Sequence, residues 1–342
     1  MSQLDWVVLI FTLLSIVVYG VWKTRGAKDL KSYLKGNNDA KWWGIGISIM
    51  ATQASAITFL STPGQAYSDG MRFIQFYFGL PIAMIILSIT FLPIFYRLKV
   101  YTAYEYLETR FDLKTRTLAA FLFLVQRGLA AGITIYAPAI ILSTLLNWNL
   151  TWTNIFIGLL VIIYTVSGGT KAVTQTQKQQ MAVMMGGMIL AGFLVINMLP
   201  ENISFIDALH VAGKMEKLNL VNFDFSLDDR YNFWTGTTAA LFLFLSYFGT
   251  DQSQVQRYLS GKSLSQSRLG LMMNGLLKIP MQFIILFIGV MVFVFYQFNT
   301  PPVFFNKVEL NNVKNSAYSK NIHDLENEYK SLHEKKSIEI YG

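Results

Sequence analysis

A run of small and polar residues interrupts the second apolar stretch of the chain, where a helix facing only lipid has no use for them. The run reads Ala51-Thr52-Gln53-Ala54-Ser55-Ala56-Ile57-Thr58. If the helix unwinds here, freed carbonyls become ligands for a hard cation such as Na+, and the hydroxyls and the amide face a solute. The alternative is a continuous helix whose Ser and Thr hydroxyls bond back to carbonyls four residues earlier. Neither Gly nor Pro breaks the middle of the run, so both interpretations stay open.

Two basic residues also lie inside apolar runs, at Arg127 and Lys278. An arginine inside the membrane costs at least about 2.5 kcal/mol on insertion scales, so Arg127 is expected to face a cavity and a partner. Its guanidinium pairs with a carboxylate in a two-pronged fashion, which predicts a clamp for an anionic solute. Lys278 precedes Pro280 by two residues and fits a kink with a lysine that faces a cavity. The alternative for both is a long side chain that snorkels to the cytoplasmic interface.

Catalytic chemistry finds no support in the sequence. The chain has no Cys, and its three histidines, His210, His323 and His333, lie outside the apolar runs. It contains no nucleophile elbow, no His-Glu-x-x-His and no phosphate loop. It also shows no basic groove interleaved with aromatic residues, which argues against binding to nucleic acid. We therefore expect neither an enzyme nor an organic cofactor.

The composition predicts an all-helical protein that crosses a lipid bilayer many times. Of its 342 residues, 53% are hydrophobic and only 14% are charged, whereas a soluble protein has about 25% charged residues. A bilayer core needs roughly 20 apolar residues per helix. Eight stretches meet this length, approximately Leu4 to Trp22, Trp42 to Leu60, Phe73 to Tyr96, Leu118 to Leu146, Thr151 to Ser167, Met181 to Leu199, Phe233 to Gly249 and Leu269 to Phe298. The polar tail, residues 301–342, is expected to be a surface loop, with a short solvated helix over Asp324 to Lys336 as the alternative.

The distribution of Lys and Arg predicts the orientation of these spans in a cell membrane. The loops on one side carry sixteen such residues, namely Lys23, Arg25, Lys28, Lys31, Lys35, Lys41, Arg97, Lys99, Arg110, Lys114, Arg116, Lys171, Lys178, Arg257, Lys262 and Arg268. The short loops on the other side carry four, namely Arg72, Lys214, Lys217 and Arg230. Basic loops stay in the cytoplasm, so the N-terminus is expected outside.

Four motifs, taken in order, resemble the sodium:solute symporter family, which includes sodium-glucose, monocarboxylate and sialic acid cotransporters. They are Ala51 to Gly64 with Tyr67 and Gly70, Tyr101 to Phe111, Tyr164 to Gln180, and Asp251 to Arg257 with Lys262-Ser263. The resemblance implies a fold of the leucine-transporter type, with one extra N-terminal helix before two inverted five-helix repeats. Under it, residues 1–300 form the membrane domain, residues 42–199 the first repeat, and residues 233–298 the start of the second.

The resemblance also implies site residues. Sodium would be held by the backbone carbonyls of Ala51 and Ala54. The solute would contact side chains at the positions Gln53, Ser55, Thr58, Gln75, Arg127, Tyr247 and Lys278. Tyr247 is equally well explained as an ordinary packed aromatic.

Two departures from the family pattern affect these expectations. The acidic residue that the family usually has after its Gly-Gly turn is Gln177 here, which argues against a second sodium. Three core helices of the implied fold have no counterpart before Gly342, and the remaining sodium ligands would come from one of them.

The sequence therefore predicts sodium-coupled symport of a small polar solute, a sugar or an organic anion, by alternating access. The expected partners are the solute, sodium and the lipid bilayer. The alternative is a membrane receptor or sensor that resembles a transporter but does not transport. Solute identity, stoichiometry and oligomeric state are left open.

Overall fold

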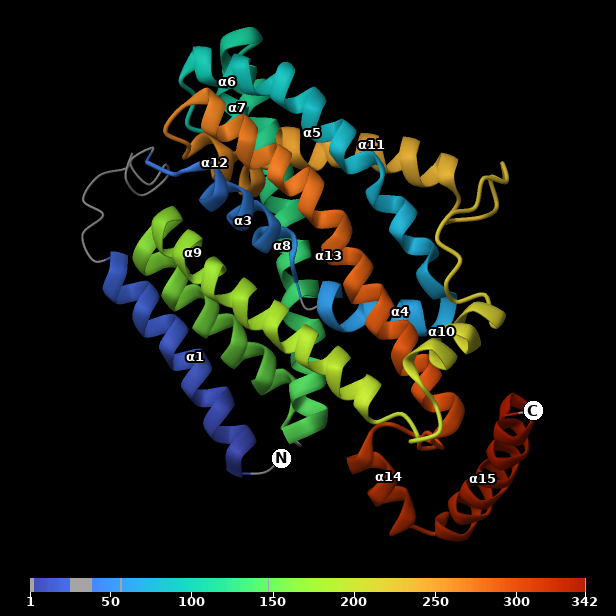
Figure 1. The fold of residues 1–342 in the computed structure, drawn as a ribbon. Helices are drawn as coiled ribbons and strands as arrows, with labels where there is room; N and C mark the ends of the chain where they lie inside the picture. Colours follow the sequence, from blue (N-terminus) through green and yellow to red (C-terminus); the bar gives the residue numbers. More distant parts are fainter. Residues whose placement is uncertain (1–2, 25–38, 56, 147, 342) are drawn as a thin grey trace.

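The computed structural model is a bundle of helices (Figure 1). It describes residues 3–24, 39–55, 57–146 and 148–341, so Ala56 and the predicted cytoplasmic residues Arg25, Lys28, Lys31 and Lys35 lie outside the described part. Strand pairing within the described part is limited to one bridge, between Ala40 and Gly261. The elements in chain order are α1 Gln3–Thr24, α3 Trp42–Gln53, a π-helical turn Ile57–Ser61, α4 Thr62–Asp69, a 3-10 helix Gly70–Tyr77, α5 Gly79–Ile89, α6 Phe91–Leu98, α7 Ala103–Arg110, α8 Leu113–Leu146, α9 Leu150–Asn197, α10 Phe205–Lys214, α11 Phe233–Thr250, α12 Gln252–Leu259, α13 Leu264–Phe298, α14 Lys307–Lys314 and α15 Ser319–Tyr341.

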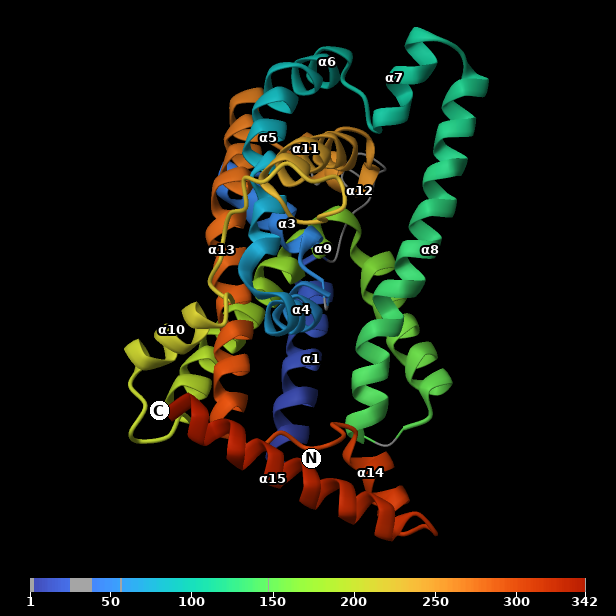
Figure 2. The same cartoon turned by 90° about the vertical axis from the view of Figure 1, so that its right-hand side faces the viewer.

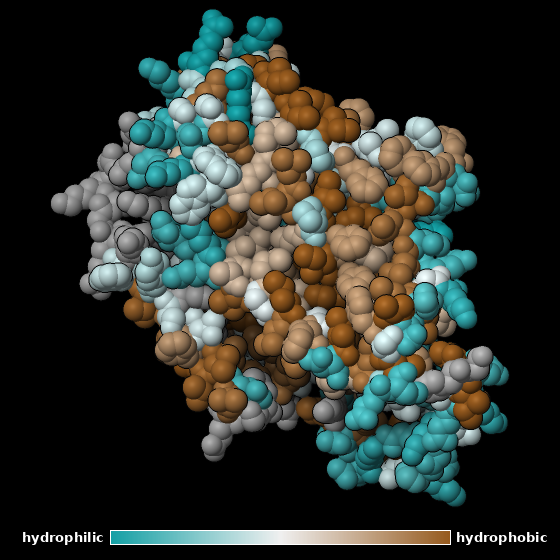
Figure 3. Space-filling view, viewed as in Figure 1, coloured by the Kyte–Doolittle hydropathy of each residue, from teal (hydrophilic) through white to brown (hydrophobic). Residues whose placement is uncertain are grey.

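Four helical stretches of the described residues are long and apolar enough to cross a membrane: Ile57–Leu98, Leu113–Leu146, Val173–Asn197 and Leu264–Phe298. A shorter apolar helix covers Leu150–Ile163. On the face that Figure 3 shows, apolar side chains cover much of the middle of the molecule, while hydrophilic ones gather at the upper left and the lower right. A protein with this surface and these helices is a multi-pass membrane protein.

Two predicted spans differ from the structure in their continuity. The span predicted from Trp42 to Leu60 is not one helix, because α3 ends at Gln53. The spans predicted on either side of Gly168-Gly169 are joined, because the backbone is helical throughout α9. This 48-residue helix bends sharply in its middle, so its two halves run in different directions (Figures 1 and 2). The predicted turn is therefore a bend in a helix.

Helix α13 lies at the centre of the packing and contacts α3, α4, α5 and α9 (Figure 1). By contrast, α8 stands to one side of the bundle, where it contacts α7 and α9 (Figure 2). Along the whole of α8 only Ala139 is buried. The core that positions the central helices is thus built around α13, with α1 packed against α9 on the outside.

A glycine on α13 permits the closest approach between this helix and α4. A Cβ at Gly289 would lie 2.2 Å from the backbone oxygen of Pro63. We expect Gly289→Ala to push the two helices apart and to lower the free energy of unfolding by about 1–3 kcal/mol, the usual cost of overpacking. Gly128→Ala is the matched control, because a Cβ at Gly128 on α8 meets nothing within 4 Å. Thermal unfolding in lipid nanodiscs measures both, and equal melting temperatures would contradict the close contact.

The tail folds as two helices, α14 and α15, so the predicted surface loop is wrong. Lys314 pairs with Glu326 at 2.7 Å between the two helices. His333 of α15 is buried and its ring nitrogens face Thr300 Oγ1 at 3.3 Å and the Tyr296 carbonyl at 3.0 Å. These contacts fix α15 beside the end of α13.

Candidate solute and sodium site

The polar run after the start of the second apolar stretch unwinds the helix. Ala54 follows α3 with extended backbone angles, φ −82° and ψ 105°, and a π-helical turn precedes α4. Thr58 Oγ1 bridges the gap: it donates to the Gln53 carbonyl and accepts from the Ser55 amide, both at 3.5 Å. Of the two interpretations left open above, the structure therefore has the broken helix.

The backbone at the break offers oxygen ligands of the kind that a hard cation prefers. The Ala54 amide donates to the carbonyls of Met50 at 2.9 Å and Ala51 at 3.2 Å. The Ala51 carbonyl thus keeps a second lone pair, and Ala54 lies outside any helix. Gln53 Oε1 is buried and has no hydrogen-bond partner among the described residues. These oxygens fit Na+, and the assignment of sodium to Ala51 and Ala54 stays a prediction.

Gln177 ties the second half of α9 to α3 just before the break. Its Oε1 accepts from Ser48 Oγ at 2.9 Å, and its Nε2 donates to Thr52 Oγ1 at 2.9 Å. An amide is able to serve two hydroxyls in this way because it has both a donor and an acceptor. A carboxylate at this position has only acceptors when ionised, so the departure from the family pattern changes the bonding as well as the charge.

We expect Gln177→Leu to lower the free energy of unfolding by about 1–3 kcal/mol, because two part-buried hydroxyls lose a partner. Gln177→Glu keeps the acceptor for Ser48 and loses the donor to Thr52, so its loss is expected to be of similar sign and smaller. Denaturant unfolding in detergent micelles compares the three proteins. A Leu variant as stable as the wild type would contradict this bonding.

Three polar side chains follow one face of α13 at intervals of four residues: Asn274, Lys278 and Gln282. All three are completely buried. The atoms Asn274 Oδ1, Lys278 Nζ and both amide atoms of Gln282 have no hydrogen-bond partner among the described residues. Lys278 therefore does not snorkel to an interface but lies inside the bundle, and α13 continues through Pro280 without a break.

This face of α13 lies alongside the break between α3 and α4. Met281 shares an apolar cluster with Met50 and Ala51 at the end of α3. Gly289 meets Pro63 at the start of α4. The stretch of α13 between Met281 and Gly289 therefore runs past the break, and Lys278 lies one turn before it.

Arg127 and Tyr247 come together in a second cluster, between α8 and the junction of α11 and α12. The guanidinium of Arg127 forms an ion pair with Asp251 and donates to Ser253 Oγ at 2.7 Å. It also lies over the Tyr247 ring, with Cζ 5.5 Å from the ring centroid. The charge that was predicted to clamp an anionic solute thus already has a carboxylate partner within the chain.

Gln75 anchors the loop between α10 and α11. Its Nε2 donates to the carbonyls of Tyr231 at 2.8 Å and Arg72 at 3.3 Å, and its Oε1 accepts from the Asn222 amide at 3.0 Å. A contact with solute would have to replace these bonds. The predicted solute-binding residues therefore fall into three groups. Gln53, Ser55 and Thr58 lie at the break, with Lys278 on the helix beside it. Arg127 and Tyr247 form a separate pair, and Gln75 holds a loop.

The model of the family described as "Sodium:solute symporter family" matches residues 33–324, which is most of the chain. The chain belongs to the sodium:solute symporter family. This result confirms the resemblance of the four motifs.

Relatives within the family are informative about the extent of the chain. Sodium-coupled monocarboxylate transporter 1 of Xenopus laevis is 33% identical over 276 residues, which cover 79% of this chain and 44% of the relative. The sodium/iodide cotransporter of Homo sapiens is 31% identical over 299 residues, which cover 85% of this chain and 45% of the relative. The structure described as the substrate-bound outward-open state of a Na+-coupled sialic acid symporter has a TM-score of 0.81 at 27% identity, covering 89% of this chain and 64% of that one. The chain thus has the predicted all-helical fold. It spans less than half the length of the monocarboxylate and iodide transporters that it matches.

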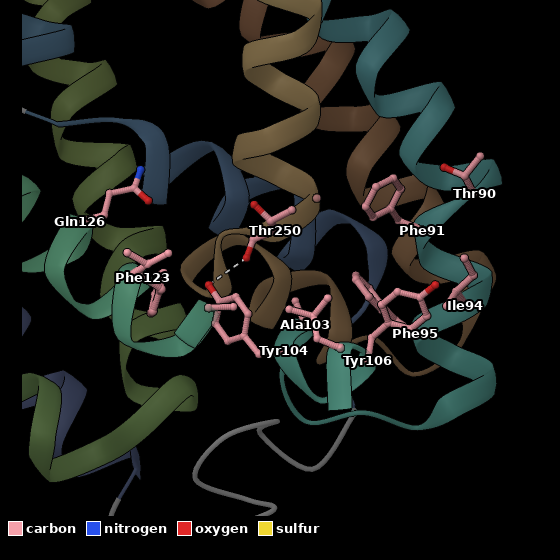
Figure 4. A pocket seen from close by; sticks show the side chains of 14 residues that line it. Thr90, Phe91, Ile94, Phe95, Ala103, Tyr104, Tyr106, Phe123, Gln126 and Thr250 are labelled. Atoms are coloured by element: carbon pink, nitrogen blue, oxygen red, sulfur yellow. Dashed lines mark hydrogen bonds between the residues drawn. The ribbon is translucent and has the colours of Figure 1, made fainter. Parts of the chain in front are cut away.

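The chain also has an apolar cavity of about 500 Å³ that contains none of the predicted solute-binding residues. It lies between α5–α6, α7, α8 and the end of α11 (Figure 4). Tyr104 lies in its wall and donates to the Thr250 carbonyl at 3.0 Å (Figure 4). Burial raises the pKa of Tyr104 to about 12, which keeps this donor protonated. The lining is mainly aromatic and aliphatic, unlike the polar group at the break.

Three residues of the site were missed by the sequence: Asp251, Gln282 and the bonding role of Gln177. Asp251 follows directly after an apolar run that is otherwise free of acids, and that position was a signal for a partner of Arg127. Gln282 lies four residues after Lys278, so helical spacing already placed both on one face. Gln177 carried no signal for its hydroxyl partners, because they lie more than 120 residues away in the chain.

Proposed function

We propose that this chain forms the sodium- and solute-binding part of a symporter that takes up a small organic anion. Support for an anion comes first from the structure. Lys278 is completely buried and its Nζ has no hydrogen-bond partner among the described residues, whereas Arg127 is neutralised by Asp251. A buried charge without compensation is costly, and an anionic solute beside Lys278 removes that cost.

The relatives support the same class of solute. Their names refer to monocarboxylates, iodide and sialic acid, all of which are anions at neutral pH. In the proposed site Lys278 provides the counter-charge, while Gln53, Ser55 and Thr58 at the break provide polar contacts. Arg127 and Tyr247 then hold α8 against the α11–α12 junction and do not clamp the solute.

Sodium binds in this proposal at the carbonyls of Ala51 and Ala54. The ion neutralises the dipoles of a helix end and fixes the backbone of the break, which orders the polar side chains that follow it. Coupling arises because sodium and solute favour the same conformation, so each increases the affinity for the other. The N-terminus and α15 lie outside the cell, as the basic loops predict.

The test is uptake by the protein in proteoliposomes with an imposed sodium gradient. We expect radiolabelled propionate or lactate to accumulate with an inward sodium gradient and not with an equal potassium gradient. Uncharged glucose is the control solute and is expected to stay at the background level. Sodium-dependent binding without accumulation would contradict transport by this chain and favour a receptor, and the absence of both would contradict the proposed site.

A further inference from the structure

The proposed function assigns no contact to the side-chain amide of Gln282. The side chain is completely buried, and neither Oε1 nor Nε2 has a hydrogen-bond partner among the described residues. Most buried amides in folded proteins have at least one partner, and a buried amide without one is costly. Such a group is therefore a candidate for contact with a bound polar molecule.

The position of Gln282 places it beside the proposed solute site. It lies one turn after Lys278 on the same face of α13, about 6 Å further along the helix axis. Its neighbour Met281 packs in one cluster with Ala51, and Gly289 meets Pro63. Gln282 therefore lies at the height of the break, where Gln53 Oε1 is also buried and has no hydrogen-bond partner among the residues that the structure describes.

The chemistry of these groups defines a class of solute. An ammonium group selects a carboxylate, whereas an amide offers one acceptor and one donor group to a neutral hydroxyl. The separation of one helical turn fits a hydroxyl that lies a few bonds from the carboxylate of the same small molecule. A plain monocarboxylate would leave the Gln282 amide without a partner.

We propose that Gln282 contacts the solute and selects hydroxylated carboxylates over plain carboxylates of the same carbon number. This inference rests on the proposed function, in which Lys278 binds the carboxylate. It adds a specificity-determining residue on an unbroken helix, opposite the broken one. A site built around a hydrogen bond to a hydroxyl rejects the analogue that lacks the hydroxyl, because the polar group of the site is then left alone.

The experiment measures equilibrium binding to the full chain in nanodiscs at saturating sodium, with lactate against propionate and 3-hydroxybutyrate against butyrate. The wild type is expected to bind the hydroxylated member of each pair about tenfold more tightly. In Gln282→Leu this ratio is expected to fall below about twofold, with unchanged affinity for propionate and butyrate. The matched control is Gln297→Leu, a buried glutamine near the other end of α13, which is expected to keep the wild-type ratio.

A second variant keeps the inference testable if the Leu variant unfolds. Gln282→Glu places a carboxylate one turn from Lys278, where an ion pair within the helix is expected to displace every carboxylate solute. The role of Gln282 would be overturned if the wild type bound both members of each pair equally, or if Gln282→Leu kept the preference for the hydroxylated acid. Either result would leave the proposed binding of anions intact. Failure of the wild type to bind any of the four acids would instead overturn the proposed function.

Discussion

Replacement of Lys278 by Met is expected to weaken binding of carboxylates by about 100-fold or more and to raise the melting temperature of the free protein. The two effects have one cause. Lys278 Nζ is buried and has no hydrogen-bond partner in the described part of the chain, so its charge is expected to destabilise the free protein and to be compensated by a bound anion in the proposed site. Loss of a charge-assisted contact in a desolvated site costs roughly 2–5 kcal/mol of binding, and each 1.4 kcal/mol is about tenfold in affinity.

The stabilisation follows because Met fills nearly the same volume without a charge. Replacement of buried charged groups by apolar ones of similar size is neutral or stabilising by about 1–4 kcal/mol. Lys330→Met is the control, because Lys330 lies exposed on α15 and is expected to change neither quantity. Calorimetric titration with lactate and thermal unfolding give both results. If Lys278→Met keeps its affinity for lactate, or is less stable than the wild type, Lys278 stabilises the fold and does not bind the solute.

The second large effect is expected at the ion pair between Arg127 and Asp251. Asp251→Asn keeps the cap of α12, because Asn caps helices as well as Asp does, but it removes the charge opposite Arg127. Loss of one partner of a buried pair costs about 3–5 kcal/mol. We expect about 2 kcal/mol here, since the Arg127 side chain is 30% exposed while that of Asp251 is 7% exposed.

A double-mutant cycle separates this coupling from other losses. The double variant Arg127→Met with Asp251→Asn is expected to be more stable than Asp251→Asn alone, because no unpaired charge is left. Denaturant unfolding gives the four free energies of unfolding. Additive effects of the two substitutions on the free energy of unfolding would contradict the ion pair.

Lactate affinity gives a second result with the same proteins. Arg127→Met is expected to keep its affinity for lactate within a few-fold, in contrast to Lys278→Met. Loss of lactate binding in Arg127→Met would show that Arg127 contacts the solute.

Local patterns predicted the residue types of the site but not their partners. The polar run at Ala51 to Thr58 and the charges at Arg127 and Lys278 stand out against an apolar background, so sequence alone located them. Whether the run unwinds depends on packing of α3 and α4 against α13, which no local propensity expresses. The ion pair of Arg127 with Asp251, and the bonds of Gln75 to Tyr231 and Asn222, join residues more than 120 positions apart, which only the fold brings together.

The fold shows the same division between local and distant information. Length and hydropathy predicted the helical membrane architecture, because every polar backbone group inside a bilayer must find its hydrogen-bond partner within the chain. They did not predict the joined α9, since two glycines and a lysine at its middle are typical of a turn. In the tail, Glu and Lys on neighbouring turns indicated the helix that the structure extends over 23 residues as α15.

The unbroken α13 holds both halves of its broken partner. Met281 of α13 packs in one cluster with Ala51 at the end of α3, and Leu286 of α13 packs in another with Ala66 of α4. Interlocked side chains of this kind resist sliding and pivoting. The spacing between the end of α3 and the start of α4 is therefore set by α13, and any lengthening or shortening of the break requires α13 to bend or one of these two contacts to open.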